Sequence, residues 1–307
     1  MTSITDIDDH NHEPEDGASV DWQESFCLAW YDPVQRIGGF QHTGMQRVRG
    51  IADAWCWITH EGRAVEKYHN NKLPLPEADY SDITIGPIQL RSEQPLTHRR
   101  LMVEHGRVRA DLRYAARGET VGLSYDVGGS SMGRGHWENF GRVAGTVTID
   151  GTDYAIDAAA FQDRSWGTRD WGSILTYRWN WATFGDDLIF SIYRVVGRDG
   201  TQAMGHVFDR GTWHQVRSVD FAIEMASDGV SPLGSIATVW LDDGTGYRLR
   251  GRCDGSSVQT QRDGYMMCNA CTNYELGGRL GTGFIEVSEL KQPTSPEIAR
   301  QLAEAAH

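Results

Sequence analysis

Residues 161–172 read Phe161-Gln162-Asp163-Arg164-Ser165-Trp166-Gly167-Thr168-Arg169-Asp170-Trp171-Gly172 and are the most informative part of this sequence. Two carboxylates, two guanidiniums and two indoles fall within nine residues. A core segment avoids such density because each buried charge needs a partner, and a surface segment avoids exposed tryptophan. The stretch therefore indicates either an aromatic-lined site with a few ionisable groups or an Arg–Asp network that joins two sheets. Both interpretations stay open.

Two further motifs lie upstream, His136-Trp137-Glu138 and the run Gly145-Thr146-Val147-Thr148-Ile149-Asp150-Gly151. With residues 161–172 they form a series that resembles the two-domain lipocalin-like proteins related to AttH and to carotenoid 1,2-hydratase (hydroxyneurosporene synthase). The resemblance is sharpest over residues 136–172 and weaker over the N-terminal half. Many relatives carry histidine where this chain has Arg164. The family spans hydratases and proteins of unknown activity, and fungal decalin-forming cyclases share a related fold, so the resemblance implies a fold more than a reaction.

The rest of the chain follows a β pattern. Some sixteen runs of aromatic and β-branched residues, from Ser25–Tyr31 to Gly281–Val287, are separated by turn residues. Dipeptides such as Asp150-Gly151 favour tight hairpin turns. The sequence predicts an all-β protein of two lipocalin-like β-barrel or sandwich domains packed against each other, over residues 21–160 and 161–292.

The two ends of the chain have different compositions. Residues 1–20 are rich in Asp, Glu and His and poor in large apolar residues, so they predict a disordered acidic tail. Ser295-Pro296-Glu297 offers an N-cap, a proline at the first helical position and an acidic first turn. A short helix is therefore expected over residues 293–307.

Composition narrows the possible partners. The formal net charge of −13 disfavours nucleic acid and anionic membranes as partners. No apolar run is long enough to span a membrane, and the first residues lack the apolar core of a secretory signal. Five cysteines without a signal favour reduced thiols. We expect a cytoplasmic protein without membrane insertion.

Familiar catalytic motifs occur only out of context. Gly129-Ser130-Ser131-Met132-Gly133 matches the G-x-S-x-G elbow, but no helical pattern follows it. His136-Trp137-Glu138 and Cys268-Asn269-Ala270-Cys271 imitate zinc-deaminase halves without the proline or the α/β pattern of that class. We therefore expect no metal site and no cofactor.

Four residues are candidate catalytic groups: Asp163, Glu138, His136 and Arg169. Asp163 is the leading acid or base because desolvation against indoles raises a carboxyl pKa, although a nearby arginine opposes this. Glu138 is the second carboxylate, since a pair with separated pKa values can divide acid and base roles. His136 shares a strand face with Glu138. The alternative is that His136 and Glu138 form only a structural hydrogen-bonded pair.

Aromatic residues supply the candidate substrate contacts. In strands, alternate residues share a face, so Tyr177, Trp179 and Trp181 should point the same way. These three residues line a pocket for an apolar ligand or belong to the core. The full set of predicted substrate-binding residues is Trp166, Trp171, Tyr177, Trp179, Trp181 and Arg164.

Two functions from different classes remain. The first is a cofactor-independent enzyme that acts on a hydrophobic, isoprenoid- or polyketide-like small molecule by alkene hydration or dehydration, isomerisation or cyclisation. Asp163 would protonate the substrate, and the indoles of Trp166 and Trp171 would stabilise the cation. This chemistry is what the resemblance to the hydratases implies. The alternative is a non-catalytic carrier for an apolar metabolite, in which the Asp–Arg motif is structural.

Overall fold

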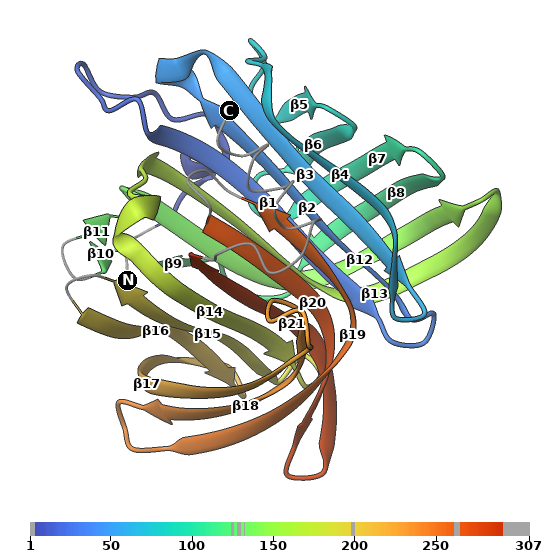
Figure 1. The fold of residues 1–307 in the computed structure, drawn as a ribbon, viewed down its shortest axis with the longest axis vertical. Coiled ribbons are helices and arrows are strands. Elements are labelled where there is room, and N and C mark those ends of the chain that lie inside the picture. Colours follow the sequence, from blue (N-terminus) through green and yellow to red (C-terminus); the bar gives the residue numbers. More distant parts are fainter. Residues whose placement is uncertain are drawn as a thin grey trace. The chain divides into compact units, whose positions relative to one another are not determined.

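The computed structural model describes residues 4–123, 126–127, 130–131, 133–197, 200–260 and 265–290 (Figure 1). Over these residues the chain is almost entirely β, and its helices are three short 3-10 turns, η1 (Asp6–Asp9), η2 (Arg47–Arg49) and η3 (Trp171–Ser173). The prediction of an all-β, lipocalin-like fold is confirmed. The helix predicted over 293–307 lies outside the described residues.

The chain divides into two compact units, with the main division between Asp170 and Trp171. Glu61–Arg63 and Val127–Ser130 group with the second unit. The sequence placed the division near residue 160. It falls later because one strand runs without interruption from Thr152 to Thr168 and stays hydrogen-bonded within the first unit.

Unit 1 is built around one barrel-like sheet of eleven strands (Figure 1). Its strand order is β4-β3-β2-β1-β13-β12-β8-β7-β6-β5, and β9 pairs with β12. The sheet curls until β5 contacts β3. The bounds are β1 (Trp22–Asp32), β2 (Ile37–Gln46), β3 (Ile51–His60), β4 (Arg63–Pro74), β5 (Asp82–Ile85), β6 (Ile88–Gln94), β7 (His98–His105), β8 (Val108–Ala116), β9 (Val121–Leu123), β12 (Gly135–Ile149) and β13 (Thr152–Thr168); β10 (Asp126–Val127) and β11 (Ser130–Ser131) form a separate pair.

The β12–β13 hairpin carries the motifs singled out in the sequence. Its turn is Asp150-Gly151, and both residues have positive φ, 49° and 80°. Two positive φ values define the hairpin turn that matches strand twist, which is why a flexible glycine follows the aspartate. The hairpin predicted from this dipeptide is confirmed.

Burial along β13 changes halfway. From Thr152 to Ala160 the strand mostly alternates between exposed or partly exposed and buried residues, as expected with one face on the core. From Phe161 onward residues on both faces are largely buried. The core of unit 1 includes Phe26, Leu28 and Trp30 of β1, so every second residue of that strand faces inward.

The N-terminal segment corrects one prediction. Residues 1–20 were expected to be disordered, but the described part holds η1, and Asp9 is only 1% exposed. Asp9 is ion-paired with Arg99, and the Asp8 carbonyl accepts a hydrogen bond from Trp137 Nε1 at 2.9 Å. Composition alone gave no sign of these partners, which stand far away in the sequence.

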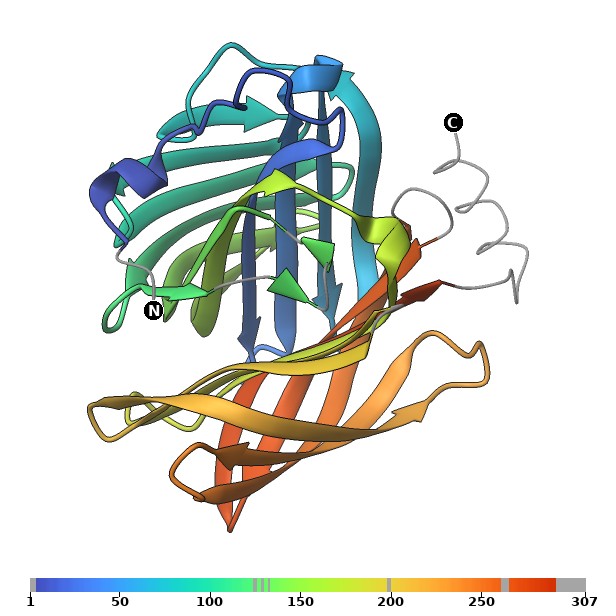
Figure 2. The same ribbon diagram turned by 90° about the vertical axis from the view of Figure 1, so that its left-hand side faces the viewer.

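Unit 2 is a closed barrel of eight antiparallel strands in chain order (Figure 2). Large side chains, among them Phe190, Leu249 and Tyr274, fill its core, as expected for a barrel of this size. The bounds are β14 (Ile174–Thr183), β15 (Leu188–Gly197), β16 (Gly200–Asp209), β17 (Thr212–Met225), β18 (Pro232–Leu241), β19 (Gly246–Thr260), β20 (Tyr265–Leu276) and β21 (Arg279–Leu290).

Candidate functional site

The four predicted catalytic residues meet on one face of the unit 1 sheet. In the β12–β13 ladder, Glu138 lies opposite Asp163 and His136 lies opposite Ser165. Residues opposite each other in an antiparallel pair share a face. Because this face is the reverse of the core side, we call His136, Glu138, Asp163, Ser165 and Arg169 the far-side cluster.

His136 and Glu138 form the closest pair of the cluster. His136 Nε2 and Glu138 Oε1 are 3.1 Å apart, at 3% and 1% exposure. Burial lowers the pKa of His136, and the positive charge of Arg169 lowers it further, against the opposing effect of Glu138. The imidazole is therefore neutral near pH 7 and can accept a proton.

Arg169 binds hydroxyl groups. Its Nη2 donates to Ser165 Oγ at 2.6 Å and to Ser25 Oγ at 3.3 Å, and the two hydroxyls are 3.0 Å apart. Ser25 lies opposite Ser165 on β1, which places it on the same face. Arg169 is buried, whereas Asp163 is only partly buried. A buried cation thus fixes two hydroxyls beside the His136–Glu138 pair.

The same face continues across β1 to a second His–carboxylate pair that sequence reasoning missed. Cys27 of β1 lies opposite both Asp163 and His42. His42 Nε2 is 3.1 Å from Asp53 Oδ1, and its ring stacks on Trp55 with centroids 4.2 Å apart. No sequence spacing indicated this neighbour, because only the register of three strands brings His42 to the row that contains Asp163.

Two predicted substrate-binding residues lie on the core side of β13. Arg164 is fully buried, forms an ion pair with Glu24 and donates to the Asp9 carbonyl. Trp166 stacks on His12, with ring centroids 3.7 Å apart. We call Asp9, Glu24, Arg99 and Arg164 the core-side cluster. Alternation along β13 therefore separates Arg164 and Trp166 from Asp163. Their contacts include Asp9 and His12 of the N-terminal segment and Glu24 of β1.

The remaining predicted aromatic residues belong to unit 2. Trp171 lies in η3, 5.3 Å from the Tyr265 ring. Tyr177, Trp179 and Trp181 alternate along β14 and are buried, as the strand pattern predicts for one shared face. Trp179 stacks on Tyr193 and donates from Nε1 to Ser191 Oγ at 3.2 Å. These contacts are those of a row of aromatic side chains that pack against neighbouring protein side chains.

Glu286 is a second carboxylate that the sequence analysis missed. It lies opposite Trp179 on β21, is 4% exposed, and accepts from Asn269 Nδ2 at 2.5 Å and from Ser288 Oγ at 3.2 Å. Burial raises its pKa to about 7, against the effect of these two donors. In the sequence, the sign of a buried carboxylate is this single glutamate within the otherwise apolar run Phe284–Val287.

The geometry of β20 argues against a deaminase-like zinc site at Cys268 and Cys271. Cys268 and Cys271 are three residues apart on β20, so alternation sends them to opposite faces. Within the described ranges, no group of three or more His, Cys, Asp or Glu side chains could hold a metal ion. None of the described helices is long and apolar enough to cross a membrane.

Comparison with known proteins bears mainly on the fold. A family model described as "Domain of unknown function (DUF7064)" matches residues 5–291. No curated protein matches the sequence.

The chain is similar to several solved structures. An AttH-like protein from Nitrosomonas europaea has a TM-score of 0.65 at 12% identity, covering 92% of this chain and 97% of its own. Kievitone hydratase from Nectria haematococca has a TM-score of 0.66 at 13% identity, covering 93% of both chains. CghA has a TM-score of 0.61 at 13% identity, covering 90% of both. At such identities the likeness shows a shared fold.

Proposed function

The chain belongs to the family of DUF7064 domains, and we propose that it is an enzyme of the hydratase or cyclase type. Its substrate is a hydrophobic, isoprenoid- or polyketide-like small molecule. The chemistry is acid–base catalysis by the side chains of the far-side cluster. One observation carries this proposal: a buried histidine–glutamate pair lies beside a partly buried carboxylate and two arginine-bound hydroxyls, all within unit 1.

The residues can divide the proton transfers of alkene hydration. Asp163 donates a proton to an alkene carbon, and the neutral His136 takes a proton from the attacking water. Glu138 orients the imidazole and stabilises its protonated form, as a carboxylate does in other histidine-based sites. The proton on His136 returns to Asp163 through solvent, so the net reaction adds one water. Dehydration is the reverse.

Arg169 is a positioning residue in this scheme. It holds the Ser25 and Ser165 hydroxyls, one of which lies opposite His136 in the ladder. Fixed hydroxyls can orient a water or a substrate oxygen without reorganisation during the reaction. The name of one protein of similar fold, kievitone hydratase, supports this class of reaction. The lowered pKa of His136 keeps the imidazole in the neutral form that can accept a proton, and it also makes the ring a weaker base.

The test is turnover of isoprenoid and polyketide-like alkenes in ¹⁸O-labelled water, followed by mass spectrometry. Asp163→Asn should lower kcat by about 10²–10⁴-fold, the usual contribution of a general acid. Asp153→Asn is the matched control, because Asp153 is an exposed carboxylate on the same strand, and its kcat should equal that of the unmodified protein. Activity of Asp163→Asn within about tenfold of the original would remove Asp163 from the acid role.

A second experiment distinguishes an enzyme from a carrier. Native mass spectrometry of protein purified from its own host reports any bound apolar molecule, and prolonged incubation reports its fate. A molecule released with altered mass supports the enzyme. A molecule released unchanged, with no turnover of any tested alkene, would support the carrier and contradict the proposal.

A further inference from the structure

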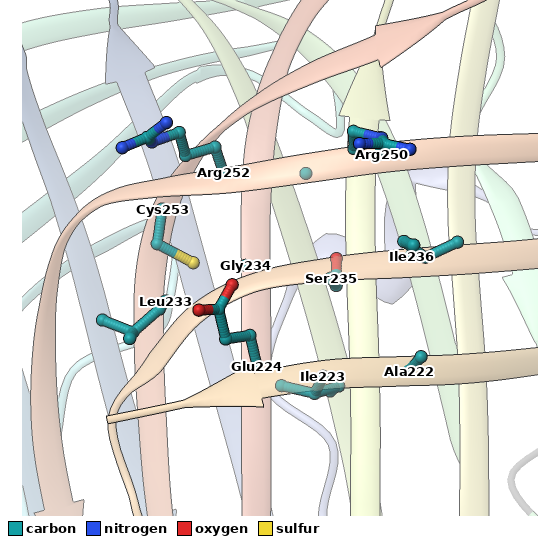
Figure 3. Close-up of a pocket in the computed structure, with 11 residues that line it drawn as sticks. Ala222, Ile223, Glu224, Leu233, Gly234, Ser235, Ile236, Arg250, Arg252 and Cys253 are labelled. Atoms are coloured by element: carbon teal, nitrogen blue, oxygen red, sulfur yellow. The ribbon is translucent and has the colours of Figure 1, made fainter. Parts of the chain in front are cut away.

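Unit 2 carries a hollow of about 750 Å³ formed by β17, β18 and β19 (Figure 3). All its lining residues belong to unit 2, whereas the far-side cluster belongs to unit 1. Cross-strand pairing arranges its outward-facing positions in two rows. One row is Glu224, Gly234 and Arg252, and the next is Ala222, Ile236 and Arg250.

The floor of the hollow is backbone. Gly234 sits between Glu224 and Arg252 and presents no side chain (Figure 3). A Cβ at residue 234 would stand 2.7 Å from the Gly251 carbonyl oxygen, which is too close, so the position is restricted to glycine. Behind the floor, Ser235 faces the barrel interior, where its Oγ accepts from Asn180 Nδ2 at 3.2 Å. The recess therefore follows from the packing of two adjacent strands.

Two guanidiniums border the recess on one side. Arg250 and Arg252 are exposed and share the outer face of β19. Within the part of the chain that the structure describes, neither forms an ion pair. The neighbouring carboxylates by register are Glu275, opposite Arg250 on β20, and Glu224, two strands from Arg252 and so roughly 10 Å away.

Apolar surface adjoins these cations. Ala222 and Ile236 lie in the row beside Gly234, and Leu233 is 47% exposed at the start of β18. Exposed apolar side chains beside a recess are typical of ligand-binding surfaces. The hollow thus combines two cations on β19 with apolar side chains on β17 and β18, beside the carboxylate of Glu224.

We propose that this hollow binds an amphipathic carboxylate, an apolar chain or ring system that ends in a carboxyl group. Arg250 and Arg252 bind the carboxylate, since a guanidinium matches its two oxygens. Ala222 and Ile236 contact the apolar part, which lies along their row toward Arg250. Glu224 on the opposite side repels the carboxylate and so fixes the direction in which the ligand lies.

The experiment is isothermal titration of the full chain with decanoate, below its micelle concentration, and with decanol. Decanoate should bind saturably, and decanol about tenfold more weakly or worse. Arg250→Ala and Arg252→Ala should each weaken decanoate binding about tenfold, a loss of about 1.4 kcal/mol. Arg248→Ala is the matched control, because Arg248 lies on the same face of the same strand but outside the hollow, and its affinity should stay within about twofold.

Three results would overturn the proposal: no saturable decanoate binding, equal binding of decanol, or an equal loss in Arg248→Ala, which would indicate general charge attraction. Circular dichroism of each variant reports whether it folds. Asp163→Asn should bind decanoate like the unmodified protein, so this result is independent of the proposed catalytic activity.

Discussion

The two sides of β13 differ in the partners of their charged side chains. On the core side, guanidiniums meet carboxylates directly, as Arg99 does with Asp9 and Arg164 with Glu24, and all four residues are at most 1% exposed. On the far side, the arginine binds hydroxyls and the histidine stays neutral beside its glutamate. A buried ion pair holds one geometry, whereas a neutral imidazole beside a carboxylate can accept a proton. Under the proposed function, adjacent residues of one strand therefore serve packing on one side and proton transfer on the other.

The largest expected effect is on the core side. Arg164→Ala leaves the buried Glu24 carboxylate without its cation and should lower the free energy of unfolding by about 3–5 kcal/mol. Arg142→Ala is the control, since Arg142 pairs with Asp157 on the exposed part of the same hairpin, and should cost about 0–1 kcal/mol. Urea denaturation measures both. Equal losses in the two variants would mean that the core-side cluster is no more than an ordinary surface pair.

A smaller loss is expected for Arg169→Ala. It removes a hydrogen bond to Ser165 at 2.6 Å and a weaker one to Ser25 at 3.3 Å. A charged hydrogen bond of good geometry contributes about 1.5–3 kcal/mol, and the longer bond adds little to this. Arg169→Lys should restore part of the stability, because lysine lacks the planar fork. The comparison with Arg164→Ala sharpens the contrast between the sides. A loss below about 1 kcal/mol, with kcat unchanged, would remove Arg169 from any positioning role.

The smallest effect is a pH dependence of stability. The pKa of His136 is lowered in the folded state, so the unfolded chain binds its proton more readily. Stability from this residue is therefore present above the ordinary histidine pKa of about 6.5 and is lost as the pH falls below it. The loss is about 1.4 kcal/mol for each unit of pKa difference.

Unfolding curves between pH 5 and 7.5, for the unmodified protein and His136→Gln, measure this term. Glu138 and Arg169 face the same imidazole, so the variant isolates the histidine from their contributions. Parallel curves would show that the histidine titrates alike in both states, which contradicts a neutral, buried imidazole on the far side.

Local pattern predicted much of the fold. The Asp150-Gly151 turn located the hairpin, and alternation correctly grouped Trp179 with Trp181. The same alternation, applied to residues 163–166, would have separated Asp163 from Arg164 and Trp166. A single site formed by all of these residues is therefore inconsistent with the alternation of the strand.

What sequence could not supply was register and long-range pairing. Asp9 resembles any residue of an acidic tail until Arg99 and Arg164 are brought to it by the fold. His42 and Asp53 reach the row beside Asp163 only through the pairing of β1, β2 and β3. Burial raises the pKa of Glu286, and no local sequence pattern indicates that this residue is buried.

The anchoring of the N-terminal segment has a consequence for synthesis on the ribosome. Asp9 binds Arg99 and Arg164, which stand 90 and 155 positions later, and β1 also pairs with β13. At roughly 5–20 residues added per second, the first residues must wait on the order of 10 s for their partners to be made. During that interval β1 has an unpaired edge, which invites association with other chains. The sheet of unit 1 is therefore completed late, when β13 pairs with β1. Chaperones that cover β1 of the nascent chain should raise the yield of folded protein.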